Sequence, residues 1–255
     1  MSPDAPTPEL EPYGALPRQL GEWWLPPDDP GGLLPTVVLV HGGFWRADYD
    51  LTLEHAVATD LAARGFLVWN VDYRSSQDPW PSTLLDAALA YDHLAVGRHR
   101  DRVDPDRVSV VGHSAGGHLA LWLASRDRLP SGAPGAGRRG PRVAAAVAQA
   151  GVVALGDAAR SGLGNGAALL LVGGHPDRLP ERYAVADPLA LLPTGVPTTC
   201  VHGVHDEDVL LSQSATYVDG SGGTARLVCF EGGHDEHLDP ASEACAAMRA
   251  ALAGR

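Results

Sequence analysis

The chain alternates between short runs of apolar residues and longer segments in which apolar residues recur every three or four positions. The first pattern predicts buried strands, and the second predicts helices with one apolar face. The run VVLV at Val37–Val40 is typical of the strands, and Leu53, Val57 and Leu61 mark one face of a helix. The predicted strands are 37–40, 66–74, 106–114, 143–151, 197–203 and 225–232, and the predicted helices are 51–64, 81–95, 115–125 and 240–252.

Strands and helices follow one another in turn, which favours an α/β fold with a mainly parallel sheet and helices on both faces. We expect one domain over residues 21–255, with an edge strand at Gly21–Leu25 and an extended segment before it at residues 1–20. The less regular segment Val152–Val196 is a candidate for a small lid. In such sheets, ligands bind outside the carboxyl ends of the strands. Functional residues are therefore expected where the predicted strands end.

One predicted strand ends in the stretch VVGHSAGGH, from Val110 to His118, which contains the pattern Gly-x-Ser-x-Gly. A serine between a buried strand and a helix sits on a very tight turn, which pushes its hydroxyl out above the sheet. Glycines two residues to either side, Gly112 and Gly116, leave room for that turn. The pattern predicts Ser114 as a nucleophile. The alternative is a serine that only caps the following helix.

A serine nucleophile needs a base to remove its proton and an acid to orient that base. In this arrangement the acid and the base follow the serine along the chain. The stretch VHGVHDEDV offers Asp206 as acid, with Asp208 and Glu207 as alternatives. The stretch FEGGHDEH offers His234 as base, since it follows two glycines past the last strand, with His237 as the alternative. A single acidic residue or histidine in a loop usually only faces solvent. Here a candidate acid and a candidate base follow two successive strands, and this joint placement favours a functional role.

The strand at Val37–Val40 runs directly into the stretch HGGFW. Attack of a serine on a carbonyl creates an oxyanion, and N–H donors must be in place to receive its charge. Glycine lets the backbone approach a substrate because it has no Cβ. We expect the N–H groups of Gly43 and Phe44, together with that of Ala115 just after the serine, to form this oxyanion hole. The alternative is an ordinary flexible turn.

The stretches HGGFW, GHSAGGHLAL, HGVHDEDV and GGHDEHLD resemble the motifs of the α/β-hydrolases in order and spacing, from about residue 20 to the C-terminus. Within that superfamily, HGGxW with GHSAGxHL is similar to the kynurenine formamidase and related esterase branch. The hormone-sensitive-lipase branch usually has a third glycine where Phe44 stands. The resemblance implies Ser114 as nucleophile, Asp206 as acid and His234 as base, and it implies no metal or other cofactor. Asp206 fits the pattern HGxxDxxV, although the proline usual after that valine is Leu210 here.

We therefore expect a serine hydrolase that cleaves a small carboxylic ester or aryl formamide through an acyl-enzyme on Ser114. Trp45, His113 and Trp80 are the predicted substrate-pocket residues, because they neighbour the motifs or lie in a strand-end loop. The 40 residues before His41 leave no room for a large cap domain, so an open site is expected. Two alternatives are an exopeptidase-like serine hydrolase and a catalytically silent binding module on the same fold.

The formal net charge of −12 disfavours nucleic acids and anionic membranes as partners, because both are negatively charged. The chain has no apolar stretch of about 18 residues that would span a membrane, and its start, MSPDAPTPEL, is not a secretory signal. Cys200, Cys229 and Cys245 are an odd number in apolar surroundings, which indicates thiols in a reducing compartment. A cytoplasmic location is expected, with a small-molecule acyl substrate as the partner. The sequence leaves the oligomeric state open, with a homodimer as one option.

Overall fold

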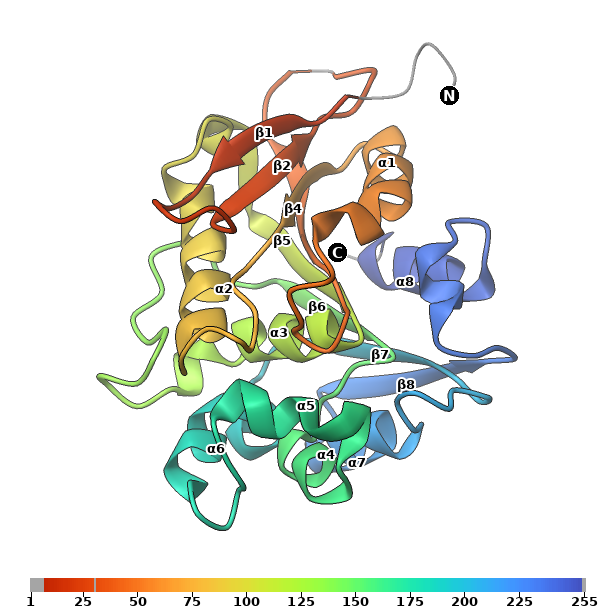
Figure 1. The fold of residues 1–255 in the computed structure, drawn as a ribbon. Helices are drawn as coiled ribbons and strands as arrows, with labels where there is room; N and C mark the ends of the chain where they lie inside the picture. Colours follow the sequence, from red (N-terminus) through yellow and green to blue (C-terminus); the bar gives the residue numbers. More distant parts are fainter. Residues whose placement is uncertain (1–6, 30, 254–255) are drawn as a thin grey trace.

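A computed structural model describes residues 7–29 and 31–253 (Figure 1). Its centre is an eight-stranded sheet in the order β1-β2-β4-β3-β5-β6-β7-β8. The strands from β4 to β8 in this order run parallel, and β2 pairs antiparallel with both β1 and β4. The strands are β1 (Glu9–Pro12), β2 (Leu20–Trp24), β3 (Leu34–Val40), β4 (Leu67–Val71), β5 (Val103–His113), β6 (Ala145–Gln149), β7 (Thr198–Gly203) and β8 (Ala225–Phe230).

Helices cover both faces of the sheet, which confirms the predicted α/β fold (Figure 1). α1 and α8 pack against one face, and the remaining α-helices pack against the other. The helices are α1 (His55–Ala63), α2 (Ser82–Asp92), α3 (Ala115–Ala124), α4 (Leu155–Ser161), α5 (Leu163–Val172), α6 (Pro180–Ala186), α7 (Ser212–Gly220) and α8 (Glu243–Ala253). Short 3-10 helices include η1 (Leu51–Glu54) before α1 and η6 (Asp235–Leu238) after β8.

The side chains of the central strand β3 point alternately to the two faces of the sheet. Val37 and Leu39 pack on the side of α1 and α8, whereas Val38 and Val40 pack on the side of α2 and α3. All four side chains are fully buried. A strand covered on both faces needs a continuous apolar run, and the branched valine side chain suits its pleated backbone.

The N-terminal part of the sheet differs from the prediction of an extended segment at residues 1–20 and an edge strand at Gly21–Leu25. Residues Glu9–Pro12 form β1, which pairs with β2 and places Glu9 opposite Trp23. β1 is therefore the edge of the sheet, and β2 lies inside it. The sequence ELEP is too short and too polar to predict a strand, so its pairing with β2 decides its conformation. Residues 1–6 of the expected segment lie outside the described residues.

The segment Val152–Val196 begins just after the carboxyl end of β6 and folds into α4, α5 and α6, which gather below α3 in the view of Figure 1. α4 ends at Gly162, whose φ is 70°, and a left-handed turn follows at Gly164–Gly166 inside α5. α7, which the sequence did not predict, has the mostly polar sequence SQSATYVDG. None of the helices in the described part of the chain has the length and apolar character needed to cross a membrane.

Candidate active site

Ser114 lies on the turn between β5 and α3, and residues 112–116 are called the serine turn below. The Ser114 backbone has φ 55° and ψ −117°, a strained conformation for a residue with a side chain. The Ser114 N–H donates to the Gln149 carbonyl oxygen at 2.8 Å, and the Val152 N–H donates to the Ser114 carbonyl oxygen at 3.2 Å. A Cβ on Gly112 would overlap the backbone of Gly116. The two glycines of the pattern therefore allow the sharp strand-to-helix turn.

The loop after β3 lies against the serine turn. A Cβ on Gly42 would lie only 3.0 Å from the carbonyl oxygen of His113. The next residues, Gly43 and Phe44, have left-handed φ values of 99° and 51°. Their N–H groups have no acceptor among the described residues, and the same is true of the N–H of Ala115 at the start of α3. Free donors on a strained loop and at a helix N-terminus form an arrangement that can stabilise an oxyanion.

Buried side chains that the sequence analysis did not single out hold this loop. His41 Nε2 lies 3.1 Å from Asp72 Oδ1, and the His41 ring stacks on Tyr73 with 4.3 Å between centroids. The Tyr73 hydroxyl donates to the His41 carbonyl oxygen at 2.8 Å. The histidine of the HGG stretch is therefore part of the support of the loop. In the sequence, the pair Asp72-Tyr73 directly after the strand that follows β3 was the feature that could have indicated this support.

Asp206 and His234 lie 28 positions apart in the chain, and the structure brings them together. His234 Nδ1 lies 2.8 Å from Asp206 Oδ2. The loops after β7 and β8 approach closely because Gly203 has no side chain, and a Cβ there would overlap the carbonyl oxygen of Gly232. The His205 N–H donates to the same Gly232 oxygen at 2.9 Å and ties the two loops together. This packing holds the acid and the histidine in hydrogen-bonding distance.

The Asp206 carboxylate is buried but well supplied with donors. Burial raises its pKa, but hydrogen bonds from His202, His234 and the Val209 N–H outweigh burial and hold the pKa of this carboxyl well below its ordinary value. Asp206 Oδ1 accepts from the N–H groups of Val209 at 2.8 Å and Asp208 at 3.0 Å. The carboxylate is therefore ionised at neutral pH. It can keep the proton of His234 on Nδ1 and leave Nε2 free to accept another.

The alternatives to these two residues are placed differently. His237 is fully buried, and neither of its ring nitrogens has a partner among the described residues. Burial lowers the pKa of His237 to about 2, so the ring stays neutral. Asp208 and Glu207 are exposed, and the carboxylate that His234 contacts is that of Asp206. The geometry therefore favours Asp206 and His234 as the acid–base pair.

Ser114 and His234 line one pocket of about 230 Å³. Ser114 Oγ and His234 Nε2 make no hydrogen bond to another described residue, so both atoms are available to a bound molecule. The pocket is also lined by carboxylates and apolar side chains that the sequence did not point to. The lining residues are Gly43, Phe44, Tyr49, Leu53, His113, Ser114, Asp208, His234, Asp235 and Leu238.

The structure places Trp45 and Trp80, two of the predicted pocket residues, outside the lining of this pocket. Trp45 is fully buried and meets the His118 ring of α3 edge-on at 5.2 Å between centroids, where its large ring removes much apolar surface from water. Trp80 packs partly buried with the guanidinium of Arg182 5.7 Å from its ring centroid. Of the three predicted residues, His113 lines the pocket.

His113 also contacts the backbone of the neighbouring loop. Its Nε2 lies 3.0 Å from the carbonyl oxygen of His234, and the two rings are 4.6 Å apart. Burial lowers the pKa of His113 to about 3, so the ring is neutral and can donate from Nε2 to that carbonyl. The pocket therefore contains one histidine, His234, whose Nε2 has no partner among the described residues, and one, His113, that is held neutral.

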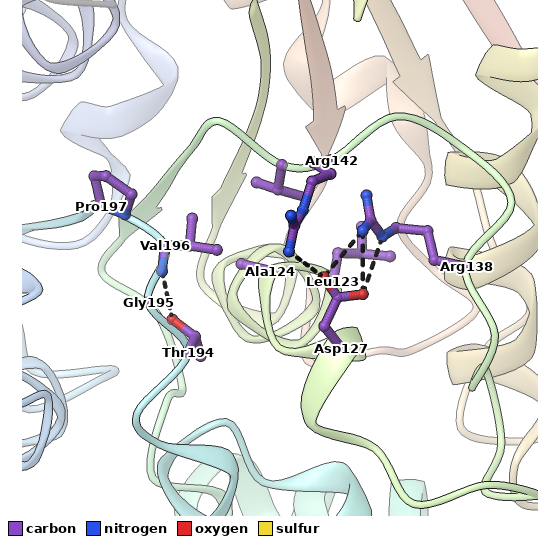
Figure 2. Close-up of a pocket in the computed structure, with 10 residues that line it drawn as sticks. Leu123, Ala124, Asp127, Arg138, Arg142, Thr194, Gly195, Val196 and Pro197 are labelled. Atoms are coloured by element: carbon purple, nitrogen blue, oxygen red, sulfur yellow. Dashed lines mark hydrogen bonds and ion pairs between the residues drawn. The ribbon is translucent and has the colours of Figure 1, made fainter. Parts of the chain in front are cut away.

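A separate pocket of about 160 Å³ lies near the amino ends of β6 and β7, at the opposite end of the strands from Ser114. Figure 2 shows that Arg138 and Arg142 both point toward Asp127 in this pocket. The nearest N–O distances are 2.9 Å and 3.6 Å. The charges there are paired with one another, and no nucleophile with an adjacent base lines the pocket.

The chain resembles known proteins in both sequence and fold. The chain is 29% identical over 231 residues to the probable carboxylic ester hydrolase LipM of Mycobacterium tuberculosis, covering 81% of this chain but only half the length of LipM. Its fold is shared with a truncated carbohydrate esterase from gut microbiota (20% identity, TM-score 0.80, 99% of this chain and 98% of that one). It is shared equally with an inhibited esterase B from Lactobacillus rhamnosis (21% identity, TM-score 0.81, 99% and 89%). The BD-FAE family model matches residues 24–219, which is most of the chain, and the protein therefore belongs to the BD-FAE family.

Proposed function

We propose that the protein is a serine hydrolase of small carboxylic esters, with Ser114 as nucleophile, His234 as base and Asp206 as the acid that orients it. The observation that carries the proposal is the shared pocket of Ser114 and His234, with His234 Nδ1 2.8 Å from the Asp206 carboxylate. The likeness to LipM, named as a carboxylic ester hydrolase, supports the same reaction class.

In the first step, His234 Nε2 takes the Ser114 proton while Oγ attacks the ester carbonyl. The negative charge moves to the carbonyl oxygen, where the free N–H groups of Gly43, Phe44 and Ala115 receive it. The carbon–oxygen bond to the alcohol then breaks, and the His234 imidazolium gives its proton to the leaving alcohol. In the second step, His234 takes a proton from water, and the water oxygen attacks the acyl carbon. The bond from that carbon to Oγ then breaks, the His234 proton passes to Oγ, and the carboxylic acid leaves.

The lining of the pocket favours esters of neutral alcohols over N-formylkynurenine. Two exposed carboxylates, Asp208 and Asp235, line it, and no arginine does. N-formylkynurenine is a zwitterion with an α-carboxylate and an α-ammonium group, and the pocket offers no cationic partner to its carboxylate, whereas a neutral ester needs none. A pocket of about 230 Å³ has room for a small acyl group. The HGGxW and GHSAGxHL motifs are the observation that favours the formamide as a second candidate substrate.

The test compares hydrolysis of p-nitrophenyl acetate, p-nitrophenyl butyrate and N-formylkynurenine by the wild type and by Ser114→Ala. We expect ester turnover that falls by orders of magnitude in Ser114→Ala, together with little formamide cleavage. Full activity of Ser114→Ala would refute the assignment of the nucleophile. Preference for N-formylkynurenine would instead support a formamidase. A silent binding module would hydrolyse none of the three and would not be labelled by a fluorophosphonate at Ser114.

A further inference from the structure

A second histidine contacts the Asp206 carboxylate. His202 lies on β7 and is fully buried. Its Nε2 lies 3.3 Å from Asp206 Oδ2 and 2.7 Å from the carbonyl oxygen of Val209. Oδ2 is the same oxygen that lies 2.8 Å from His234 Nδ1. Two imidazole rings therefore meet on one carboxylate oxygen, and only one of them, that of His234, lines the pocket.

These contacts determine which nitrogen of His202 carries the proton. The two partners of Nε2 are a carbonyl and a carboxylate, which only accept, so Nε2 must donate. Nδ1 lies 2.7 Å from the hydroxyl of Ser214, a fully buried residue of α7. The hydroxyl can donate to Nδ1, which keeps the proton on Nε2 and fixes the orientation of the ring. A continuous buried chain thus runs from Ser214 through His202 and Asp206 to His234.

We propose that His202 is a positioning residue of the hydrolase reaction and that Ser214 sets its tautomer. His202 shares its one Nε2–H between the Val209 carbonyl oxygen at 2.7 Å and Oδ2 at 3.3 Å, which helps to fix the plane of the carboxylate and offsets part of its charge. His234 then meets Oδ2 in one orientation, with Nε2 directed into the pocket. His202 itself forms no bond to the substrate. The inference rests on the proposed function, because it acts through Asp206 and His234.

Substitutions at His202 have graded expected effects. His202→Phe keeps a planar ring but removes the Nε2 donor and the Nδ1 acceptor, so kcat should fall about tenfold to a hundredfold, the range for a hydrogen bond to a charged group. KM should stay unchanged, because His202 does not line the pocket. His202→Gln can place an amide N–H near the position of Nε2 and should recover part of the rate. His202→Asn is too short to reach Asp206 and should resemble His202→Phe.

The pH profile separates a positioning role from a purely structural one. Without His202, Asp206 Oδ2 keeps more of its charge and binds the His234 imidazolium more strongly. The acidic limb of kcat/KM should therefore move to higher pH in His202→Phe. The other titratable groups around this cluster are of two kinds. His113, His237 and Cys200 have pKa values of about 3, about 2 and about 12 because of burial, and Asp208, Glu207 and Asp235 are exposed. None of the three buried groups changes charge near neutral pH, so a shift there reports on the carboxylate and its two histidines.

The experiment measures hydrolysis of p-nitrophenyl acetate against pH for the wild type, the three His202 variants and Ser214→Ala. His205→Gln is the matched control, because His205 is an exposed histidine three residues away whose ring contacts Glu231 at 3.0 Å. Thermal unfolding and titration with a fluorophosphonate count the folded, reactive enzyme in each sample. We expect lower kcat in the Phe and Asn variants, partial recovery in Gln, a smaller loss in Ser214→Ala and a wild-type profile in His205→Gln.

Two results would overturn the role of His202. One is a His202→Phe enzyme with the wild-type kcat and pH profile. The other is a loss of rate that equals the loss of folded enzyme in every His202 variant, with the acidic limb unmoved. The proposed function fails separately, if Ser114→Ala remains active. An inactive Ser114→Ala beside a fully active His202→Phe would refute the inference alone.

Discussion

Gly116 in α3 lies directly against Val40 in β3, so closely that a Cβ on the glycine would overlap the valine carbonyl oxygen. This contact presses the serine turn onto the end of the neighbouring strand. It brings the free N–H groups of the loop after β3 beside Ser114, although about 70 residues separate the two segments. The missing side chain at Gly116 therefore helps to assemble the candidate site.

Gly116→Ala should destabilise the protein and reduce its activity. The added methyl group meets the backbone oxygens of Val40 and His41, which cannot move aside as a flexible side chain would. We expect a loss of about 1–3 kcal/mol in the free energy of unfolding, as for other overpacked sites. Urea unfolding measures this change. Gly156→Ala in α4 is the control, since its Cβ would meet only side-chain ends at 3.3–3.4 Å, and it should be neutral or stabilising. Equal stability of the two variants would contradict the argument.

Substitutions of His234 and His237 should have opposite effects on activity. His234→Ala removes the base of the proposed mechanism, and kcat should fall by about a thousandfold or more. His237→Leu replaces a buried ring whose nitrogens have no partner in the described part of the chain, so the variant should keep its activity. Its free energy of unfolding should be equal or higher, within about 1 kcal/mol. Steady-state kinetics and urea unfolding of both variants test this, and an inactive but folded His237→Leu would speak against His234 as the base.

Glu54 should make the stability of the protein fall as pH rises. Its side chain is fully buried without a partner among the described residues, and burial raises its pKa from 4.5 to about 8. The folded state therefore holds a proton that the unfolded chain releases above about pH 4.5. The associated stability is complete below that pH and is lost as pH rises through about 8, by up to about 1.4 kcal/mol per unit. Glu54→Gln removes this dependence, so its stability relative to the wild type should rise with pH. Urea unfolding of both proteins across this range measures the slope, and parallel curves would contradict the prediction.

Gly164 should affect the reaction through Phe44. A Cβ on Gly164 would collide with the Phe44 ring, and Arg46 donates to the Gly164 carbonyl oxygen at 2.7 Å. Gly162 is a matched control, because its φ of 70° resembles the 60° of Gly164 but it has open space around it. Both alanine variants carry the strain of a left-handed backbone, but only Gly164→Ala displaces the oxyanion loop. We expect its kcat/KM for p-nitrophenyl acetate to be about tenfold to a hundredfold below that of Gly162→Ala. Equal kcat/KM values for the two variants would show that the packing of Gly164 against Phe44 does not hold the oxyanion loop in place.

Local patterns were enough for the main elements of the fold. The apolar runs predicted β3 to β8 to within a few residues, because the inner strands are buried on both faces and need such runs, while β8 at the edge is only partly buried. The pattern failed for β1, whose few residues become a strand only through pairing with β2, and for the mostly polar α7. Nor did it indicate that Trp45 is fully buried, since closeness to a motif does not reveal the side to which a side chain turns.

The sequence by itself determined the fold class, the serine turn and the glycine loop, because each depends on backbone conformation within a few neighbouring residues. Only the tertiary structure decided how differently His234 and His237 are placed, although both stand in the same short stretch. The packing of Gly203 against Gly232 brings one of them to Asp206, while the other is buried without a partner. Contacts between segments far apart in the chain also place His202 beside Ser214 and hold His41 on Asp72. A side chain's role depends on the polar groups it meets, and those groups come together only when the sheet is assembled.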